Sequence, residues 1–327
     1  MHAIRVTEHG GPEVMKWVEM PTPVPVRGEV LVRLEAAGVN FIDVYFRSGA
    51  YPSELPAIPG LEGAGVVEAV GPEMTALKVG DRVAWSDRVG ASRGGTYATH
   101  VIVPEARAVT VPAEVPLPVA AAAMLQGMTA HYLCHSTFPL AAGQTCLVHA
   151  AAGGVGLILC QMAKRRGARV IGTVSNDAKA ALARGAGADD VILYTQQDFA
   201  AEARRLTNGR GVDVVYDSVG LTTFEKSLDA LARRGMLVLY GQSSGKVPPF
   251  DPQALNGKGS LFLTRPSLYH YVSTREELVQ RAGDVLGAVK EGKLDVRIGA
   301  KFPLSNAADA HRALEGRETT GKVVLVP

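Results

Sequence analysis

The sequence predicts an α/β protein with two domains, one β-rich and one built on a doubly wound parallel sheet. The first observation is the length of 327 residues, because one domain typically takes about 100–200 residues. The second is a change near residue 119, where short strands separated by turns give way to strands alternating with helices. The third is a glycine-rich turn at residues 151–156, which follows an apolar strand and opens an apolar helix.

The first domain is predicted over residues 1–123 and is completed by residues 266–327. Its strands are expected at residues 30–35, 65–70 and 82–85, separated by glycine- and proline-rich turns. We interpret this part as a compact, partly closed barrel. The apolar tail at residues 322–327 predicts a last strand that returns to this domain.

The second domain is predicted over residues 124–265. Strands are expected at residues 146–150, 169–174, 190–194, 212–218, 235–240 and 260–265. Helices are expected at residues 155–166, 177–185, 199–207 and 223–232, with further helices at 118–134 and 275–290. Strands that alternate with helices imply a parallel sheet covered on both faces.

Composition and charge disfavour several classes of protein. Hydrophobic residues make up 47% of the chain and charged residues 20%, which is typical of a globular protein. The net charge of +2 is too small to indicate nucleic acid as a partner. Residues 115–163 lack Asp, Glu, Lys and Arg, but Pro, Gln and His interrupt them, so we expect a buried segment and no membrane span. Three cysteines and the lack of a signal-peptide pattern predict a cytoplasmic protein.

The turn has the spacing of a dinucleotide-binding fingerprint. Ala151, Gly153 and Gly156 occupy its three small positions. Small residues allow a tight turn and a close approach of the backbone to a pyrophosphate. The helix that follows offers free N–H groups and the positive end of its dipole to the phosphates. The sequence therefore predicts a nicotinamide dinucleotide cofactor.

The second strand of this domain indicates which nicotinamide cofactor binds. An acidic residue at its end favours NAD, and a positive group favours NADP. Here the strand is followed by Ser175, which can donate a hydrogen bond, and by Lys179, which can neutralise a 2′-phosphate. The alternative for Lys179 is a solvated side chain in the first turn of a helix. Asp177 is interpreted as an N-cap or first-turn residue, and we expect NADPH.

The order of a β-rich part, a nucleotide-binding part and a C-terminal return resembles the medium-chain dehydrogenase/reductase superfamily. The resemblance implies a GroES-like β-rich catalytic domain followed by a Rossmann domain. Zinc alcohol dehydrogenases of that superfamily carry a cysteine and a histidine where this chain has Asn40 and Leu61. Neither residue offers a thiolate or an imidazole, so we expect no metal. His131 and His135, four residues apart, are interpreted as ordinary helix residues.

Several segments are similar to the zinc-free branch of zeta-crystallin-like quinone oxidoreductases, and to its bacterial NADPH:quinone reductases. The segments are Asn40-Phe-Ile-Asp-Val-Tyr45, Pro59-Gly-Leu-Glu-Gly-Ala-Gly65, His149-Ala-Ala-Ala-Gly-Gly-Val-Gly156, Tyr216-Asp-Ser-Val-Gly220 and Thr264-Arg-Pro-Ser-Leu268. The resemblance covers the whole chain and implies NADPH between the two domains, a quinone substrate and a homodimer. Its implied cofactor contacts are Phe41, Ile42, Asp43, Thr129, Gly153, Gly154, Val155, Ser175, Lys179, Tyr194, Ser218, Gln242 and Arg317.

Three residues are candidates for catalysis. Asn40 is expected to hydrogen-bond a quinone oxygen or the nicotinamide amide, and its alternative is a loop residue that bonds local backbone. Tyr45 and Tyr51 are expected to stack on a quinone ring, and their alternative is an amphipathic cleft wall without chemistry. Two acidic residues nearby receive structural interpretations. Asp43 orients Asn40 or caps a helical turn, and Glu62 is a buried partner of Arg47 or of another base.

The predicted strand at residues 260–265 is strongly apolar and lies near a sheet edge. An uncovered apolar edge invites association, so pairing with the same strand of a second subunit would explain it. Burial under residues 269–271 of the same chain is the alternative. The resemblance favours the homodimer.

Three functions are consistent with the sequence. The first is reduction of quinones by NADPH. The second is reduction of α,β-unsaturated aldehydes or ketones, which requires a proton at the α-carbon and would make Tyr45 or Tyr51 essential. The third is a non-catalytic NADPH-binding protein with a crystallin-like, redox-sensing or RNA-binding role.

Overall fold

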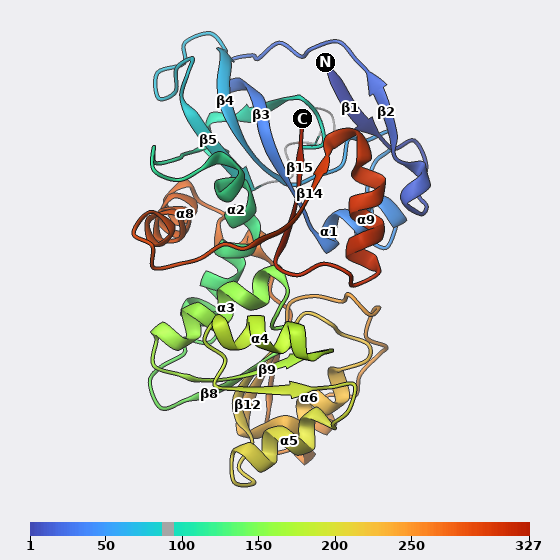
Figure 1. The fold of residues 1–327 in the computed structure, drawn as a ribbon, viewed down its shortest axis with the longest axis vertical. Helices are drawn as coiled ribbons and strands as arrows, with labels where there is room; N and C mark the ends of the chain where they lie inside the picture. Colours follow the sequence, from blue (N-terminus) through green and yellow to red (C-terminus); the bar gives the residue numbers. More distant parts are fainter. Residues whose placement is uncertain (87–94) are drawn as a thin grey trace. The chain divides into compact units, whose positions relative to one another are not determined.

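The computed structural model describes residues 1–86 and 95–327, and the chain divides into two compact units. Unit 1 consists of Met1–Met128 and Val272–Pro327, and unit 2 consists of Thr129–Tyr271. Figure 1 labels the helices and strands and colours them from the N-terminus to the C-terminus. No helix within the described residues has the length and hydropathy that a membrane span requires.

Unit 1 is built on a mixed sheet with the strand order β14-β15-β3-β4-β5-β7, and β6 also pairs with β3. A separate ribbon is formed by the antiparallel strands β1 and β2. The strands of this unit are β1 (His2–Arg5), β2 (Lys16–Glu19), β3 (Glu29–Val39), β4 (Glu62–Val70), β5 (Arg82–Ser86), β6 (His100–Pro104), β7 (Val109–Thr110), β14 (Ile298–Pro303) and β15 (Lys322–Val326). The predicted return of the C-terminal strand is confirmed, because β15 pairs antiparallel with β3.

The helices of unit 1 are α1 (Phe41–Ser48), α8 (Arg275–Lys290) and α9 (Ala307–Glu315), together with α2 (Leu117–Tyr132), which continues into unit 2. Short helical turns lie at η1 (Pro12–Val14), η2 (Glu105–Arg107) and η5 (Leu304–Asn306). Helix α8 has the predicted bounds. Its first turn is fixed by a capping box, in which Thr274 accepts from the backbone of Glu277 and Glu277 reaches back to Thr274.

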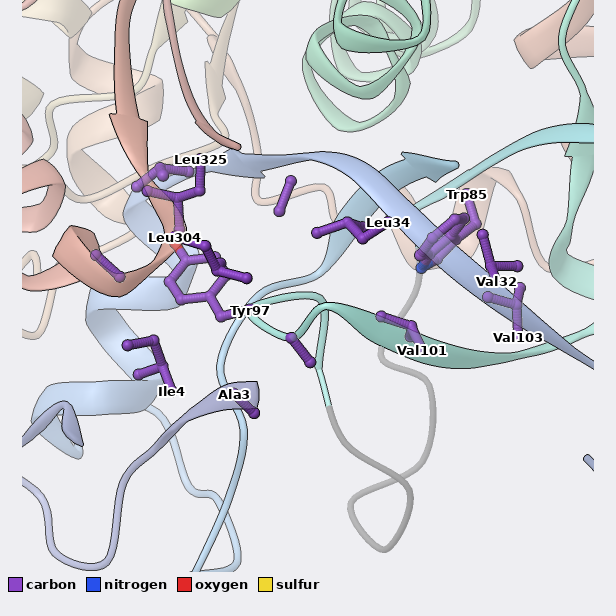
Figure 2. Close-up of a cluster of buried hydrophobic side chains, with 14 of the residues drawn as sticks. Ala3, Ile4, Val32, Leu34, Trp85, Tyr97, Val101, Val103, Leu304 and Leu325 are labelled. Carbon is purple, nitrogen blue, oxygen red and sulfur yellow. The ribbon is translucent and has the colours of Figure 1, made fainter. Parts of the chain in front are cut away.

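A core cluster of unit 1 is formed by buried side chains from the sheet, from β1 and from the C-terminal segment. Tyr97, Leu304 and Leu325 gather at one end of it, and Trp85, Val32 and Val103 at the other (Figure 2). Trp85 and Tyr97 are both fully buried. Burial of these large apolar surfaces, together with the aliphatic side chains around them, stabilises the unit.

Unit 2 contains a parallel sheet with the strand order β10-β9-β8-β11-β12-β13 over its described residues. The strands are β8 (Thr145–Val148), β9 (Arg169–Val174), β10 (Asp190–Leu193), β11 (Val212–Asp217), β12 (Leu231–Leu239) and β13 (Phe262–Thr264). Counted within the unit, this is the order 3-2-1-4-5-6 of a Rossmann sheet. The chain therefore has the predicted α/β class, with a β-rich part and a Rossmann-type sheet.

The helices of unit 2 are α3 (Gly154–Arg165), α4 (Asp177–Gly185), α5 (Phe199–Leu206), α6 (Phe224–Ala230) and α7 (Gln253–Gly257), with η3 (Leu133–Thr137) and η4 (Leu268–Tyr271) at its ends. Figure 1 shows α3 and α4 on one side of β8 and β9, with α5 and α6 on the other. Apolar strands such as β8, whose residues are all buried, are covered on both faces in this arrangement.

Two local predictions are wrong. Helix α6 ends at Ala230, and strand β12 starts at Leu231 instead of residue 235, because β12 continues past a register shift opposite Val212. The sequence predicts loops at residues 47–56 and 85–95, and the first of these is wrong at residues 47 and 48, because α1 extends through Ser48 and is capped by Gly49, whose φ of 79° suits glycine. In the second segment, residues 85 and 86 belong to β5, and residues 87–94 lie outside the described residues. The alternative in which residues 269–271 bury the edge strand is also wrong, since Phe262 is 55% exposed and Leu263 is 37% exposed.

Candidate functional site

The turn between β8 and α3 is as tight as the fingerprint predicts. Ala150 has a φ of 50°, and its carbonyl accepts from the backbone N–H of Gly153 at 2.8 Å. A Cβ atom at Gly156 would lie 2.3 Å from the carbonyl oxygen of Ala150, so only glycine permits this approach of helix to strand. Gly153, Gly154 and Val155 are partly exposed at the helix N-terminus, where backbone N–H groups are not used within the helix. This geometry is suited to a bound pyrophosphate.

The predicted 2′-phosphate residues gather beyond the ends of β9 and β10. The backbone N–H of Tyr194 donates to Val174, and the hydroxyl of Thr195 donates to the carbonyl of Ser175 at 2.9 Å. Asn176 is the N-cap of α4 and accepts from the backbone of Lys179, so Asp177 is a first-turn residue. Ser175 and Lys179 are half-buried, and Tyr194 is 41% exposed. The structure thus brings Ser175, Lys179 and Tyr194 to one edge of the sheet.

The loops after β11 and β12 carry Ser218 and Gln242. The carbonyl of Ser218 accepts from Ser243, and a Cβ atom at Gly241 would lie 2.5 Å from that same carbonyl oxygen. Ser218 and Gln242 are both half-buried. These loops and the turn after β8 all follow the carboxyl ends of parallel strands, where the strand order reverses between β8 and β11. Ligands of doubly wound sheets bind outside such a reversal point.

The register of three strands in unit 1 gathers Asn40, Glu62 and Lys322. Glu62 lies opposite Gly38, and Val323 lies opposite Val39. Asn40, which follows β3, therefore lies beside the first residue of β4 and the first residue of β15. A Cβ atom at Gly38 would lie 2.3 Å from Glu62 Oε1, so glycine there makes room for the carboxylate.

Asn40 is 4% exposed and is held by charged and amide side chains. Its Oδ1 accepts from Lys322 Nζ at 2.7 Å and from Gln126 Nε2 at 3.2 Å. Its Nδ2 donates to Glu62 Oε1 at 2.6 Å, and Lys322 also donates to that oxygen. The other oxygen of Glu62 accepts from the backbone N–H of Leu125. Counted over the residues that the structure describes, these contacts use all but one N–H of the amide's hydrogen-bonding capacity.

The sequence predicts Arg47 or another base as the partner of Glu62. The structure shows that the partner is Lys322, so the prediction of Arg47 is wrong. Arg47 instead forms a bidentate ion pair with Glu315, with both distances at 2.9 Å. Lys322 is 1% exposed and Glu62 is fully buried. Burial lowers the pKa of Lys322, while Glu62 favours its charged form. A buried lysine beside a buried carboxylate is stable because each neutralises the other.

A chain of hydrogen bonds extends from Asp43 to Arg47. The backbone N–H of Asn40 donates to Asp43 Oδ2, as expected for a capping residue. The hydroxyl of Tyr97 donates to the same oxygen at 3.3 Å and lies 2.9 Å from His311 Nε2, while Arg47 Nη1 donates to His311 Nδ1 at 3.0 Å. All these side chains come from unit 1.

Burial shifts the pKa values of the groups in this chain of hydrogen bonds. Burial raises the pKa of Asp43 to about 7, and Asp43 Oδ1 has no hydrogen-bond partner among residues 1–86 and 95–327. It lowers the pKa of His311 to about 3, with Arg47 acting in the same direction. It also raises the pKa of Tyr97 well above its ordinary value. His311 is therefore neutral near pH 7, and Asp43 changes its charge there.

Helix α1 buries Asp43, Val44 and Arg47 and leaves its aromatic side chains half-exposed. The rings of Tyr45 and Tyr51 lie 5.1 Å apart, with Phe41 6.3 Å from Tyr45. The backbone N–H of Tyr51 donates to the carbonyl of Tyr45 at 3.0 Å. The structure therefore brings the two predicted tyrosines together, with Phe41 beside Tyr45, while Ile42 is half-buried on the same helix. Partly exposed aromatic rings of this kind can stack on a planar ring.

The remaining predicted residues are placed on other elements. Thr129 is buried in α2, and Arg317 follows α9 with a φ of 58°. Cys134, Cys146 and Cys160 are buried, and burial raises the pKa of each thiol. In the described part of the chain, no three His, Cys, Asp and Glu side chains are arranged to hold a metal ion.

Sequence reasoning missed Lys322, Gln126, Tyr97 and His311. One signal was present for Lys322, which is a single charge at the start of the apolar strand Lys322-Val-Val-Leu-Val. A charge in such a strand requires a buried partner. No comparable pattern marks the other three residues, because only the tertiary structure brings them to α1.

Comparison with known proteins agrees with this geometry. Residues 154–283 match the family model of the zinc-binding dehydrogenases, and residues 26–113 match that of the alcohol dehydrogenase GroES-like domain. A quinone oxidoreductase of Pseudomonas aeruginosa is 45% identical over 99% of both chains. The chain belongs to the quinone oxidoreductase family. The predicted resemblance to quinone oxidoreductases of the medium-chain dehydrogenase/reductase superfamily is thereby confirmed.

Two further relatives bear on ligand and substrate. The structure of Escherichia coli quinone oxidoreductase, solved in complex with NADPH, is 42% identical, covers 100% of both chains and has a TM-score of 0.97. A 2-haloacrylate reductase of a Burkholderia species is 43% identical over 98% of both chains. The first relative binds the expected cofactor, and the second reduces a different conjugated acceptor.

Proposed function

We propose that this chain is an NADPH-dependent quinone reductase. The observation that carries the proposal is the set of sites at the carboxyl ends of β8, β9, β11 and β12. The turn after β8 has room only for glycine at position 156, and it leads into the N-terminus of α3. Lys179, after β9, is suited to a 2′-phosphate. The family membership and the NADPH complex of the Escherichia coli relative support the same cofactor.

The residues present fit NADPH. Gly153, Gly154 and Val155 would hold the pyrophosphate through backbone N–H groups, since the close contact at Gly156 shapes the turn for it. Ser175, Lys179 and Tyr194 would hold the adenosine and its 2′-phosphate, and we include Arg317 in that set. We assign Thr129, Ser218 and Gln242 to the rest of the cofactor, with Phe41, Ile42 and Asp43 beside the nicotinamide.

When bound, NADPH supplies the reducing equivalents, so the protein mainly contributes proximity and orientation. Tyr45 and Tyr51, whose ring centroids lie 5.1 Å apart with the planes tilted by 58°, offer neighbouring aromatic surfaces, and a quinone would stack on one of them. Asn40 positions this surface, because it begins α1 and is held by Lys322, Glu62 and Gln126. The amide N–H of Asn40 that has no bond to a described residue would donate to a quinone oxygen or to the nicotinamide amide. Transfer of a hydride equivalent to the quinone leaves a quinol oxyanion, which would take one proton from solvent, so no side chain is needed as an essential acid.

Turnover with purified protein tests this function. NADPH consumption is followed by its absorbance with 1,4-benzoquinone, with a conjugated enone and without an acceptor. We expect the quinone rate to exceed both the enone rate and the uncatalysed rate. NADPH binding without turnover of either acceptor would instead support a non-catalytic role.

A second candidate, reduction of α,β-unsaturated carbonyl compounds, is favoured by the 2-haloacrylate reductase relative. This reaction needs a proton at the α-carbon, and the phenols of Tyr45 and Tyr51 are the nearest acids on the aromatic surface. Tyr45→Phe and Tyr51→Phe variants separate the candidates. A stacking role predicts little change in the quinone rate, while a proton donor predicts a loss of about 100-fold in the enone rate.

We further propose that the chain forms a homodimer through β13. This strand is at the end of the sheet order, and Phe262 and Leu263 are exposed on it. Pairing two copies of an edge strand around a twofold axis would cover both edges. Leu263→Lys is expected to give a monomer in analytical ultracentrifugation, and Val279→Lys, at an exposed position of α8, is the control.

A further inference from the structure

A buried chain of hydrogen bonds links four side chains of unit 2 that the proposed function does not use. His149 Nδ1 lies 2.8 Å from the hydroxyl of Thr173, and His149 Nε2 lies 3.0 Å from the hydroxyl of Ser227. Ser227 donates to Asp217 Oδ2 at 3.0 Å. All four residues are at most 2% exposed.

The chemistry of the groups fixes the direction of each bond. The other oxygen of Asp217 accepts from the backbone N–H groups of Val219 and Gly220, at 2.7 and 3.0 Å. Because the Asp217 carboxylate can only accept, the hydroxyl of Ser227 donates to its Oδ2. The oxygen of Ser227 therefore accepts the hydrogen bond from His149 Nε2–H. Nδ1 of the neutral ring then accepts from Thr173. Burial lowers the pKa of His149, which keeps the ring neutral.

This arrangement does not create a nucleophile. The proton of Ser227 points to Asp217 and away from the imidazole, the reverse of an activated serine. The rings of Phe199 and His149 pack edge to face, with their centroids 4.6 Å apart. Ser227 is fully buried. The histidine, the serine and the aspartate therefore have a role in binding or positioning.

The network joins the carboxyl ends of three neighbouring strands. His149 follows β8 and immediately precedes Ala150, Thr173 lies near the end of β9, and Asp217 ends β11. The backbone of Thr173 also accepts from Ala151 at 3.1 Å, so β9 holds the turn through both its backbone and its hydroxyl. Asp217 likewise fixes the start of the loop that carries Ser218. The hydroxyl of Thr223, at the start of α6, donates to its carboxylate as well.

The turn requires such support, because Ala150 has a φ of 50°. A residue other than glycine in the left-handed region is strained and stays there only when its surroundings hold it. His149 is the neighbour of Ala150 in the chain, and its ring is bonded on both nitrogens.

We propose that His149 is a positioning residue for NADPH, through which Thr173, Ser227 and Asp217 hold the turn at residues 150–154 and the loop at 218–220 ready for the dinucleotide. The inference rests on the proposed function and deepens it, because it assigns cofactor affinity to buried groups that do not touch the cofactor. The network stabilises the turn and the loop together, so losing one bond is expected to weaken both halves of the site.

The test is NADPH binding to the full chain with Thr173→Val, which removes the hydroxyl and nearly preserves the volume. We expect the Kd for NADPH to rise about tenfold and KM to rise with it, while kcat at saturating NADPH is unchanged. Thr173→Ser restores the hydroxyl and is expected to restore the Kd. Thr145→Val is the matched control, because Thr145 is buried at the opposite end of β8.

Thermal unfolding with and without NADPH separates positioning from simple stability. If Thr173→Val lowers the Tm equally in both conditions and leaves the Kd unchanged, the network is only structural and the inference is overturned. Failure of the parent chain to bind NADPH would overturn the proposed function itself. A raised Kd in Thr173→Val and a normal Kd in Thr145→Val would support the inference.

Discussion

Lys322 Nζ donates to Asn40 Oδ1 at 2.7 Å and joins the last strand of the chain to the first turn of α1. The two residues are 282 positions apart in sequence, and both are buried. Since α1 carries Tyr45, the position of the aromatic surface depends on the C-terminal segment. Lys322 thereby supports the helix that carries the proposed substrate surface.

Replacing Lys322 is expected to destabilise unit 1. Lys322→Met leaves Glu62 buried without its positive partner, which costs about 3–5 kcal/mol of unfolding free energy in comparable buried pairs. The Glu62→Gln change in the same chain removes the uncompensated charge and is expected to recover part of that loss. Denaturant unfolding of both single variants and the double variant measures the coupling. Simple additivity would contradict the pairing.

Asp43 is expected to make stability fall as pH rises from about 4 to 7. The folded chain keeps the proton to a pKa of about 7, whereas an unfolded aspartate releases it near 3.8. The folded state binds more protons in this interval, so raising the pH favours unfolding. The full shift corresponds to a few kcal/mol. Asp43→Asn removes this component of the stability. The free energy of unfolding of the parent minus that of the variant, measured at several pH values, should decline as the pH rises toward 7.

His311 is expected to act in the opposite sense. Its folded pKa of about 3 lies below the ordinary value of 6.5, so the unfolded chain binds more protons between these limits. Stability from this group therefore rises with pH through that interval and is lost as the pH falls toward 3. His311→Gln should flatten the acid side of the stability profile. An unchanged profile would show that His311 is not held neutral by burial and Arg47.

Lys179 is expected to select the phosphorylated cofactor. Lys179→Glu places a negative charge beside the proposed 2′-phosphate and should raise the Kd for NADPH about tenfold or more, while NADH binding changes little. Arg184→Glu is the control, because Arg184 is an exposed cation in the last turn of the same helix. Fluorescence titration with both cofactors gives the comparison. Equal weakening for NADPH and NADH would argue against a phosphate contact.

Gly156 is expected to be indispensable for the turn. A Cβ atom there would lie 2.3 Å from the backbone oxygen of Ala150 and 2.8 Å from Cα of Ala151, and neither atom belongs to a flexible side chain. Gly156→Ala should cost about 1–3 kcal/mol of stability and raise the Kd for NADPH. Gly185→Ala, at the end of α4 where a Cβ atom meets nothing within 4 Å, should instead be neutral or stabilising by up to about 1 kcal/mol. Thermal unfolding and NADPH titration of both variants provide the measurements.

The sequence by itself determined the α/β class, most of the element bounds and the dinucleotide turn, because these depend on residues close together in the chain. Periodicity places α8 at Arg275–Lys290, and the small residues 151–156 predict a turn whose geometry is local. The same holds for Ser175 and Lys179, whose spacing from the turn follows from one strand and one helix.

Tertiary structure alone decided the partners of buried charges. Glu62 pairs with Lys322 and Arg47 with Glu315 because strand register and helix packing bring together residues more than 200 positions apart. The network of His149 with Thr173, Ser227 and Asp217 likewise depends on the order of parallel strands, which brings three strand ends to one edge. Burial, which raises the pKa of Asp43 and lowers that of His311, exists only in the folded chain.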